Sequence, residues 1–260
     1  MTRPPTLLAV AHGTRDPQGA AATEALISRT RELHPELPLQ HCYLDLLTPS
    51  LPEALAGLTG EVVVVPLLLG TGYHIRVDIP AALADAPHLR AGIARALGPD
   101  PLLAEALTDR LHQAGWQPDE HADNGALVLA AAGSTDPRAN ADTAAMAELL
   151  RTRLPHGGPV VPAYLCATGP TPAEAVAALR AAGHPRIAVA EYLLSPGHFA
   201  RRTARSGAGL TTAPLGAHDA VARLVTIRYD EAVRHLRRTP TDKRRRAPTR
   251  RSAGTSPPGN

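Results

Sequence analysis

A motif that occurs twice constrains this chain more than any other feature. Residues 7–17 read LLAVAHGTRDP, and residues 127–137, 120 positions later, read LVLAAAGSTDP. An unbroken apolar run that ends at glycine and proline is typical of a strand buried on both faces, as in a parallel sheet. The repeat therefore predicts two copies of one α/β unit. The two copies differ at several positions, and the difference that bears on chemistry is His12 in the first copy against Ala132 in the second.

The rest of the chain alternates between apolar runs of strand length and segments of helix length. We expect eight strands, at residues 7–11, 38–45, 61–69, 93–97, 126–132, 159–166, 186–194 and 210–215. We expect helices between them, at residues 17–34, 51–58, 78–86, 99–115, 137–154, 171–183 and 217–238. This alternation predicts an α/β fold of two doubly wound parallel-sheet lobes, related by internal duplication, with right-handed crossovers.

Composition divides the chain into four parts. Residues 1–115 are expected to form the first lobe, which carries the candidate site. Residues 116–125 (WQPDEHADNG) are polar and turn-rich, which is typical of a linker. Residues 126–238 are expected to form the second lobe. Residues 239–260 have no periodicity and almost no apolar side chains, so we expect a disordered basic tail.

The positive charge of the chain is concentrated at its end. Residues 236–260 hold eight Arg and Lys and one Asp, a net +7, whereas the whole chain carries +3, so the preceding residues carry −4. This mildly acidic balance argues against nucleic-acid binding by the folded part. We interpret the tail as a solubilising extension, with contact to nucleic acid or an anionic surface as the alternative.

Several classes of protein are excluded by composition. The two cysteines form no CxxC pair, which favours a reducing compartment. No apolar run approaches membrane-spanning length, and the residues before His12 are too few for a signal peptide. We therefore expect a cytoplasmic protein without membrane association. A Walker-type phosphate loop is excluded, because the single lysine, Lys243, lies in the tail.

Three side chains able to bind a metal follow the first three predicted strands. They are His12, Asp45 and His74. Because parallel strands end at one edge of a sheet, where ligands bind in open α/β folds, these residues can converge. Two imidazoles and a carboxylate suit a first-row divalent ion such as iron, cobalt, nickel or zinc. With 12 histidines in the chain, an ordinary solvated position remains the alternative for each one.

The matching positions of the second half indicate a degenerate copy of this site. They hold Ala132, Cys166 and His198, so one histidine of the pair is missing.

Four segments make the chain resemble a known family, the class II chelatases that insert a metal into sirohydrochlorin. They are AHGTRDP (11–17), YLDLLTPSLPEAL (43–55), PLLLGTGYHIRVDIP (66–80) and LLSPGHFARR (193–202), and the resemblance extends to about residue 238. It is closest to the long two-lobed bacterial form, whose fold is two α/β lobes facing a cleft. The resemblance implies metal contacts at His12 and His74 in the N-terminal half. Asp45 stands where some members have a glutamate.

The resemblance also implies the reaction and its participants. The expected activity is ATP-independent insertion of Fe²⁺, with Co²⁺ next and Ni²⁺ admitted by the same ligands, as a step towards sirohaem or a cobalamin-type tetrapyrrole. The metal is then a substrate, and no permanent cofactor is expected. His12 and His74 would hold the metal and accept the pyrrole protons. The tetrapyrrole would be the only partner besides the metal, and the chain would act as a monomer or homodimer.

Candidate substrate contacts surround the two histidines. Arg15 and Arg76 are placed to pair with the carboxylates of the tetrapyrrole, or are ordinary surface arginines. Thr14, Gly72 and Tyr73 lie at turns that lead into helices, whose N-termini attract carboxylates.

Two other functions remain open. A histidine phosphatase also has His-Gly after a strand, but its chemistry needs an arginine directly before the histidine, where this chain has Ala11. A non-catalytic metal or tetrapyrrole carrier on the same fold is the second alternative, because fold does not fix function.

Overall fold

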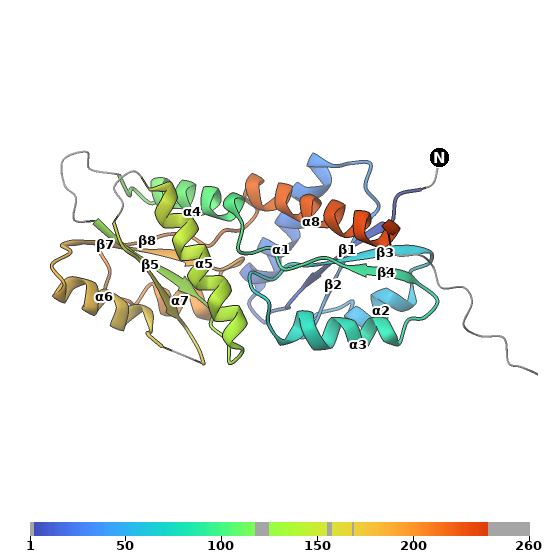
Figure 1. Cartoon of the computed structure of the whole chain (residues 1–260), viewed down its shortest axis with the longest axis horizontal. Coiled ribbons are helices and arrows are strands. Elements are labelled where there is room, and N and C mark those ends of the chain that lie inside the picture. The colour runs from blue at the N-terminus through green and yellow to red at the C-terminus, as the bar shows by residue number, and fades with distance from the viewer. Residues whose placement is uncertain (1–2, 118–124, 155–157, 168, 239–260) are drawn as a thin grey trace, which may run out of the picture.

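Two four-stranded parallel sheets form the framework of the molecule (Figure 1). The computed structural model describes residues 3–117, 125–154, 158–167 and 169–238. The first sheet has the order β2-β1-β3-β4, from β1 (Thr6–Ala11), β2 (Leu39–Tyr43), β3 (Glu61–Pro66) and β4 (Arg90–Ile93). The second has the order β6-β5-β7-β8, from β5 (Gly125–Ala131), β6 (Val160–Tyr164), β7 (Arg186–Tyr192) and β8 (Leu210–Thr211). The identical orders confirm the predicted α/β fold with duplicated lobes.

The central strands are buried on both faces, as their unbroken apolar sequences predict. Leu7–Val10 of β1 and Val62–Val65 of β3 are fully buried, and the two strands pair in parallel, with Leu7 opposite Val63. A strand covered on both faces needs apolar side chains at every position. The carboxyl ends of β1, β2 and β3 consequently lie at one edge of the first sheet.

Helices cover both faces of each sheet. They are α1 (Pro17–Leu33), α2 (Leu51–Ala56), the π-helix η1 (His74–Asp78), α3 (Ile79–Ala84), α4 (Pro101–Gln113), α5 (Pro137–Arg153), α6 (Pro172–Ala181), α7 (His198–Thr203) and α8 (Asp219–Arg238). The repeat extends to the caps: the Asp16 carboxylate accepts from the backbone N–H of Gln18 at the start of α1, as Asp136 accepts from that of Arg138 in α5. An aspartate before a proline is a strong signal for a helix start.

Four elements differ from the expectation, the first being β8, which spans Leu210–Thr211 instead of 210–215. β4 spans Arg90–Ile93 instead of 93–97, because residues 94–97 leave the sheet and their apolar side chains enter the core elsewhere. The π-helix begins at His74, ahead of the helix expected from residue 78. The short α7 was not expected, since six residues are too few to display a helical period.

The last helix of each half packs on the sheet of the other half (Figure 1). Helix α4 follows the first sheet in the chain but packs against α5 and β7, whereas α8 follows the second sheet and packs against α1, β3 and β4. One apolar core therefore runs through both lobes and includes residues of α1, α4, α5 and α8. The division at residues 1–115 and 126–238 follows the duplication, but the packing exchanges the last helix of each half.

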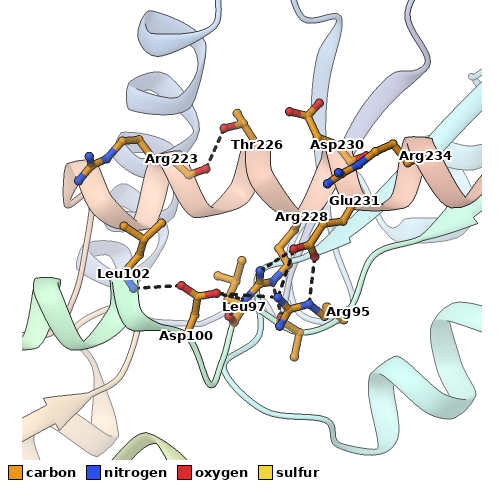
Figure 2. A network of polar contacts seen from close by, with 11 residues as sticks. Arg95, Leu97, Asp100, Leu102, Arg223, Thr226, Arg228, Asp230, Glu231 and Arg234 are labelled. Carbon is orange, nitrogen blue, oxygen red and sulfur yellow. Dashed lines mark hydrogen bonds and ion pairs between the residues drawn. The ribbon is translucent and has the colours of Figure 1, made fainter. Parts of the chain in front are cut away.

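A buried arginine of α8 bonds to the segment that leads into α4 (Figure 2). Arg228 of α8 is fully buried. Its Nε donates to the carbonyl of Ala96 at 2.9 Å, and its Nη2 donates to the carbonyl of Leu97 at 2.6 Å and to Asp100 Oδ2 at 2.8 Å. Residues 96–100 are the segment that leads from the first sheet to α4. Arg228 thus joins one exchanged helix to the start of the other.

Two expected parts lie outside the described residues. The tail at 239–260 is wholly outside them, and so is most of the linker at 116–125. Within the described residues, no helix combines the length and apolarity needed to cross a membrane.

Candidate metal centre

Two imidazoles from neighbouring strand ends meet at the carboxyl edge of the first sheet. His12 follows β1 and His74 opens η1 after β3. Their ring centroids are 4.9 Å apart, and the ring planes are perpendicular. With metal–nitrogen distances of about 2.0–2.1 Å, two imidazoles on one ion have their ring centres roughly 5 Å apart. The pair therefore has the spacing needed to hold a single metal ion.

The backbone around His12 is held by the end of β2. Gly13 has φ +94°, and a Cβ at this position would lie 1.8 Å from the carbonyl oxygen of Asp45. Only glycine fits such a close approach in this conformation. The N–H of Asp45 donates to the carbonyl of His12 at 3.0 Å, which fixes the chain direction at the histidine.

His74 is oriented by a residue that the sequence did not single out. Asp78, four residues later in η1, accepts a hydrogen bond from His74 Nδ1 at 2.6 Å. A carboxylate on one ring nitrogen fixes the tautomer and leaves the other nitrogen, here Nε2, free to bind a metal. His74 and Asp78 are four residues apart, a spacing at which side chains meet on one face of a helix. The sequence did not predict this pair because the helix was expected to start only at residue 78.

Asp45 does not complete a three-residue metal group with the histidines. Its carboxylate Oδ1 accepts from the backbone N–H of Leu46 at 2.8 Å, where it supports a residue with φ +68°. Among the described residues, no group of three or more His, Cys, Asp or Glu is arranged to hold a metal ion. The expectation that three strand ends converge is met by His12 and His74 alone.

Apolar side chains border the imidazole pair. Tyr73 is 63% exposed, Leu46 is 46% exposed and Val77 is 39% exposed. They are three of the four large apolar side chains exposed in the described part of the chain, and all lie on the segments that follow β2 and β3. The exposed apolar side chains of this lobe are thus found on the two segments next to the histidines.

Comparison with known proteins places the chain in a family. The CbiX family model matches residues 6–114 and matches again over residues 126–232. The chain belongs to the CbiX family. The two separate matches coincide with the two halves of the duplication.

Relatives of this CbiX-family chain include chelatases for two metals. The sirohydrochlorin ferrochelatase of Priestia megaterium is 26% identical over 237 residues, which cover 85% of this chain and 87% of that protein. A sirohydrochlorin cobaltochelatase of the same organism is 26% identical over 205 residues, 76% of this chain and 66% of that protein. The solved structure of SirB from Bacillus subtilis with Fe³⁺ has a TM-score of 0.74 at 25% identity, covering 88% of this chain and 96% of SirB.

The two arginines predicted to contact substrate have different surroundings in this CbiX-family chain. Arg76 Nη1 donates to Asp136 Oδ2 of the other half at 2.6 Å. The pKa of Asp136 is lowered, first by the hydrogen bond from the Arg138 backbone and also by Arg76. Arg15 is exposed beside His12. The structure therefore leaves Arg15 available to a ligand and places Arg76 in a contact between the halves.

The remaining predicted contacts lie at the two turns beside the histidines. Thr14 Oγ1 accepts from the N–H of Asp16 at 3.0 Å, and the N–H of Gly72 donates to the carbonyl of Gly70 at 3.0 Å. These groups stabilise their own turns. Tyr73 is the one of the three that projects into solvent.

At the corresponding edge of the second sheet, the described residues include no imidazole pair like that of His12 and His74. Ala132 occupies the position of His12, and the exposed Cys166 donates from Sγ to the Ala132 carbonyl at 3.0 Å. His198 begins α7, and its ring lies 5.8 Å from that of Phe199. Of the three positions that match the site of the first half, only His198 carries an imidazole, and the degenerate copy stays a prediction.

Proposed function

We propose that this protein is a sirohydrochlorin chelatase that inserts a divalent metal, Fe²⁺ in preference to Co²⁺, at the N-terminal lobe. The observation that carries the proposal is the imidazole pair of His12 and His74, with ring centroids 4.9 Å apart at the sheet edge. Membership of the CbiX family and the ferrochelatase and cobaltochelatase relatives support the reaction.

Two imidazole ligands suit a metal ion that is bound only briefly before its transfer to the tetrapyrrole. Two neutral nitrogen ligands leave most of the coordination shell to water, so the ion can pass to the four nitrogens of a tetrapyrrole. Asp78 holds Nδ1 of His74, which keeps Nε2 directed to the metal. Tyr73, Leu46 and Val77 would contact the apolar ring face, and Arg15 would pair with a peripheral carboxylate.

Metallation also requires a group that accepts the two pyrrole protons. Imidazole is suited to this because it exchanges protons near neutral pH. His12 and His74 would each accept a proton as the metal leaves them for the ring. The proposed chemistry needs neither a nucleotide nor a permanent cofactor, because the metal exchanges water and imidazole ligands for four ring nitrogens.

The test is metallation of sirohydrochlorin, followed by its visible absorption. Purified protein at catalytic concentration is mixed with the tetrapyrrole and Fe²⁺ or Co²⁺ under anaerobic conditions. We expect turnover well above the uncatalysed rate, and loss of that turnover in His12→Ala/His74→Ala. His198→Ala is the matched control and should retain wild-type rates.

Three outcomes would change the assignment. A double variant as fast as wild type would refute the site. A larger loss in His198→Ala would place the working site in the second half. Tight stoichiometric metal binding without turnover would favour the carrier function.

We also propose that the protein works as a monomer in the cytoplasm. Both cysteines, Cys42 and Cys166, are free, which suits a reducing compartment. Both lobes and their shared core come from one chain, so a second copy is not needed to build the fold.

A further inference from the structure

We infer that the second half of the chain positions His74, and that Asp142 of α5 is the residue through which it does so. The inference rests on the proposed function, because it gives the half with the degenerate site a role in presenting a histidine of the working one. Asp142 touches neither metal nor ring in this proposal, so it is a positioning residue.

The loop between β3 and His74 is held by the second half at successive residues. The hydroxyl of Tyr192, at the end of β7, donates to the carbonyl of Leu69 at 3.1 Å. Two residues later, the backbone N–H of Thr71 donates to Asp142 Oδ2 at 2.7 Å. A backbone donor on a carboxylate forms a short, charge-assisted hydrogen bond that fixes the direction of the peptide.

The chain on either side of this bond is also in contact with α5. Gly70 lies so close to the helix that a Cβ there would be 3.6 Å from the Cβ of Ala139. Beyond the histidine, Arg76 pairs with Asp136 at the N-terminus of α5. His74 is therefore bracketed by two carboxylates of one helix, Asp142 before it and Asp136 after it.

Comparing the two halves shows which contacts of this loop occur in both copies and which occur only beside the two histidines. Asp136 corresponds to Asp16 in the repeat, and Asp16 likewise binds an arginine of the other half, Arg201, at 2.7 Å. This contact therefore occurs on both sides of the molecule. Asp142 corresponds to Ala22, which has no side-chain acceptor. Of the two repeated helices, only the one facing the two-histidine site carries the carboxylate that holds the loop.

The consequence is a testable effect on the geometry of the imidazole pair. Without the Asp142 carboxylate, Thr71 loses its acceptor three residues before His74. Since a displacement of about 1 Å from productive geometry can cost about 100-fold in rate, we expect Asp142→Ala to lower kcat by roughly 10- to 100-fold. The KM for sirohydrochlorin should change less than kcat, because Arg15 and Leu46, two of the proposed ring contacts, lie outside this loop.

The experiment compares three variants with the wild type. Asp142→Ala removes the acceptor, whereas Asp142→Asn keeps an oxygen that can accept from Thr71 and should restore kcat to within about threefold of wild type. Glu148→Ala removes an exposed acid of the same helix, paired with Arg151, and serves as the matched control. Steady-state metallation gives kcat and KM. Hydrogen exchange by mass spectrometry reports the protection of residues 67–76 without metal or tetrapyrrole.

The results separate the inference from the proposed function. Faster exchange over residues 67–76 and a lower kcat in Asp142→Ala, both reversed in Asp142→Asn, would support the inference. Unchanged exchange in Asp142→Ala, or an Asp142→Asn variant as impaired as the alanine variant, would overturn it. A wild type that fails to metallate while the exchange effect persists would refute the proposed function and leave the loop contact standing.

Discussion

Asp78 lies outside the proposed metal contacts but holds one of them, His74, through a hydrogen bond. We expect Asp78→Asn to weaken Co²⁺ binding by roughly 10- to 100-fold, because an amide holds the His74 ring and its tautomer less firmly than a carboxylate does. Equilibrium titration with Co²⁺, read from its visible absorption, measures the affinity. Asp85→Asn, an exposed acid just after α3, is the control. Equal affinity in both variants would contradict the role of Asp78.

Glu191 of β7 should make stability depend on pH. Its side chain is only 3% exposed, Oε2 has no hydrogen-bond partner among the described residues, and burial raises its pKa to about 7. The unfolded chain loses this proton near pH 4.5 and the folded chain only near pH 7. Between these values the folded state binds more protons, so the free energy of unfolding falls as pH rises, by about 3 kcal/mol.

Glu191→Gln tests this dependence, because glutamine does not titrate. Urea unfolding between pH 4.5 and pH 8 should show a decline in the wild type that is largely absent from the variant. Parallel curves for the two proteins would show that Glu191 is not the source.

Among the residues of the candidate site, those that follow from a local sequence pattern could be predicted and those that depend on distant contacts could not. The convergence of His12 and His74 could be predicted because His12 directly follows a buried strand, His74 ends the glycine-rich turn after another, and parallel strands end at one edge. Asp78 pairs with His74 within a π-helical turn, and the sequence did not predict a helix at these residues. Asp142 contacts a residue 71 positions away, and no local rule predicts such a contact. Asp45 was predicted from its position after the second strand, but its carboxylate supports its own turn.

The exchanged helix α8 is tied to the start of α4 by the buried Arg228 (Figure 2). We expect Arg228→Leu to lower the free energy of unfolding by about 3–5 kcal/mol, because the carbonyls of Ala96 and Leu97 and the carboxylate of Asp100 lose their buried partner. Chemical denaturation measures the loss. Arg234→Ala, which removes an exposed arginine of the same helix, should change stability by less than about 0.5 kcal/mol. Similar losses in the two variants would contradict this account.

The order of the strands and most helices along the chain could be predicted, but the sheet on which each helix packs could not. The strands could be located because their apolar runs are unbroken, as in β3. The exchange of α4 and α8 could not be predicted, since the amphipathic pattern of a helix reveals that one face is buried but not which sheet covers it. A strand was predicted at residues 93–97 for a similar reason: the burial of Ala94, Ala96 and Leu97 does not distinguish a sheet from a connection through the core.

For the whole molecule, the shared core predicts one cooperative unfolding transition. The single tryptophan, Trp116, lies against Arg186 beside the second sheet, with the guanidinium carbon 5.1 Å from the ring centroid, so its fluorescence reports that lobe. Far-UV circular dichroism reports both lobes. We expect coincident midpoints in urea, because neither lobe can open without exposing the core that both share. Two separated transitions would show instead that the lobes are independent.

The exchange of α4 and α8 also limits how a duplicated chain of this kind can change over generations. A copy can keep its fold without the imidazole, as Ala132 at the position of His12 illustrates. Deletion of that copy is a different matter, because it would strip the first sheet of the helix that shields β3 and β4 from water. A half without its own pair of histidines is thus retained as the structural complement of its twin.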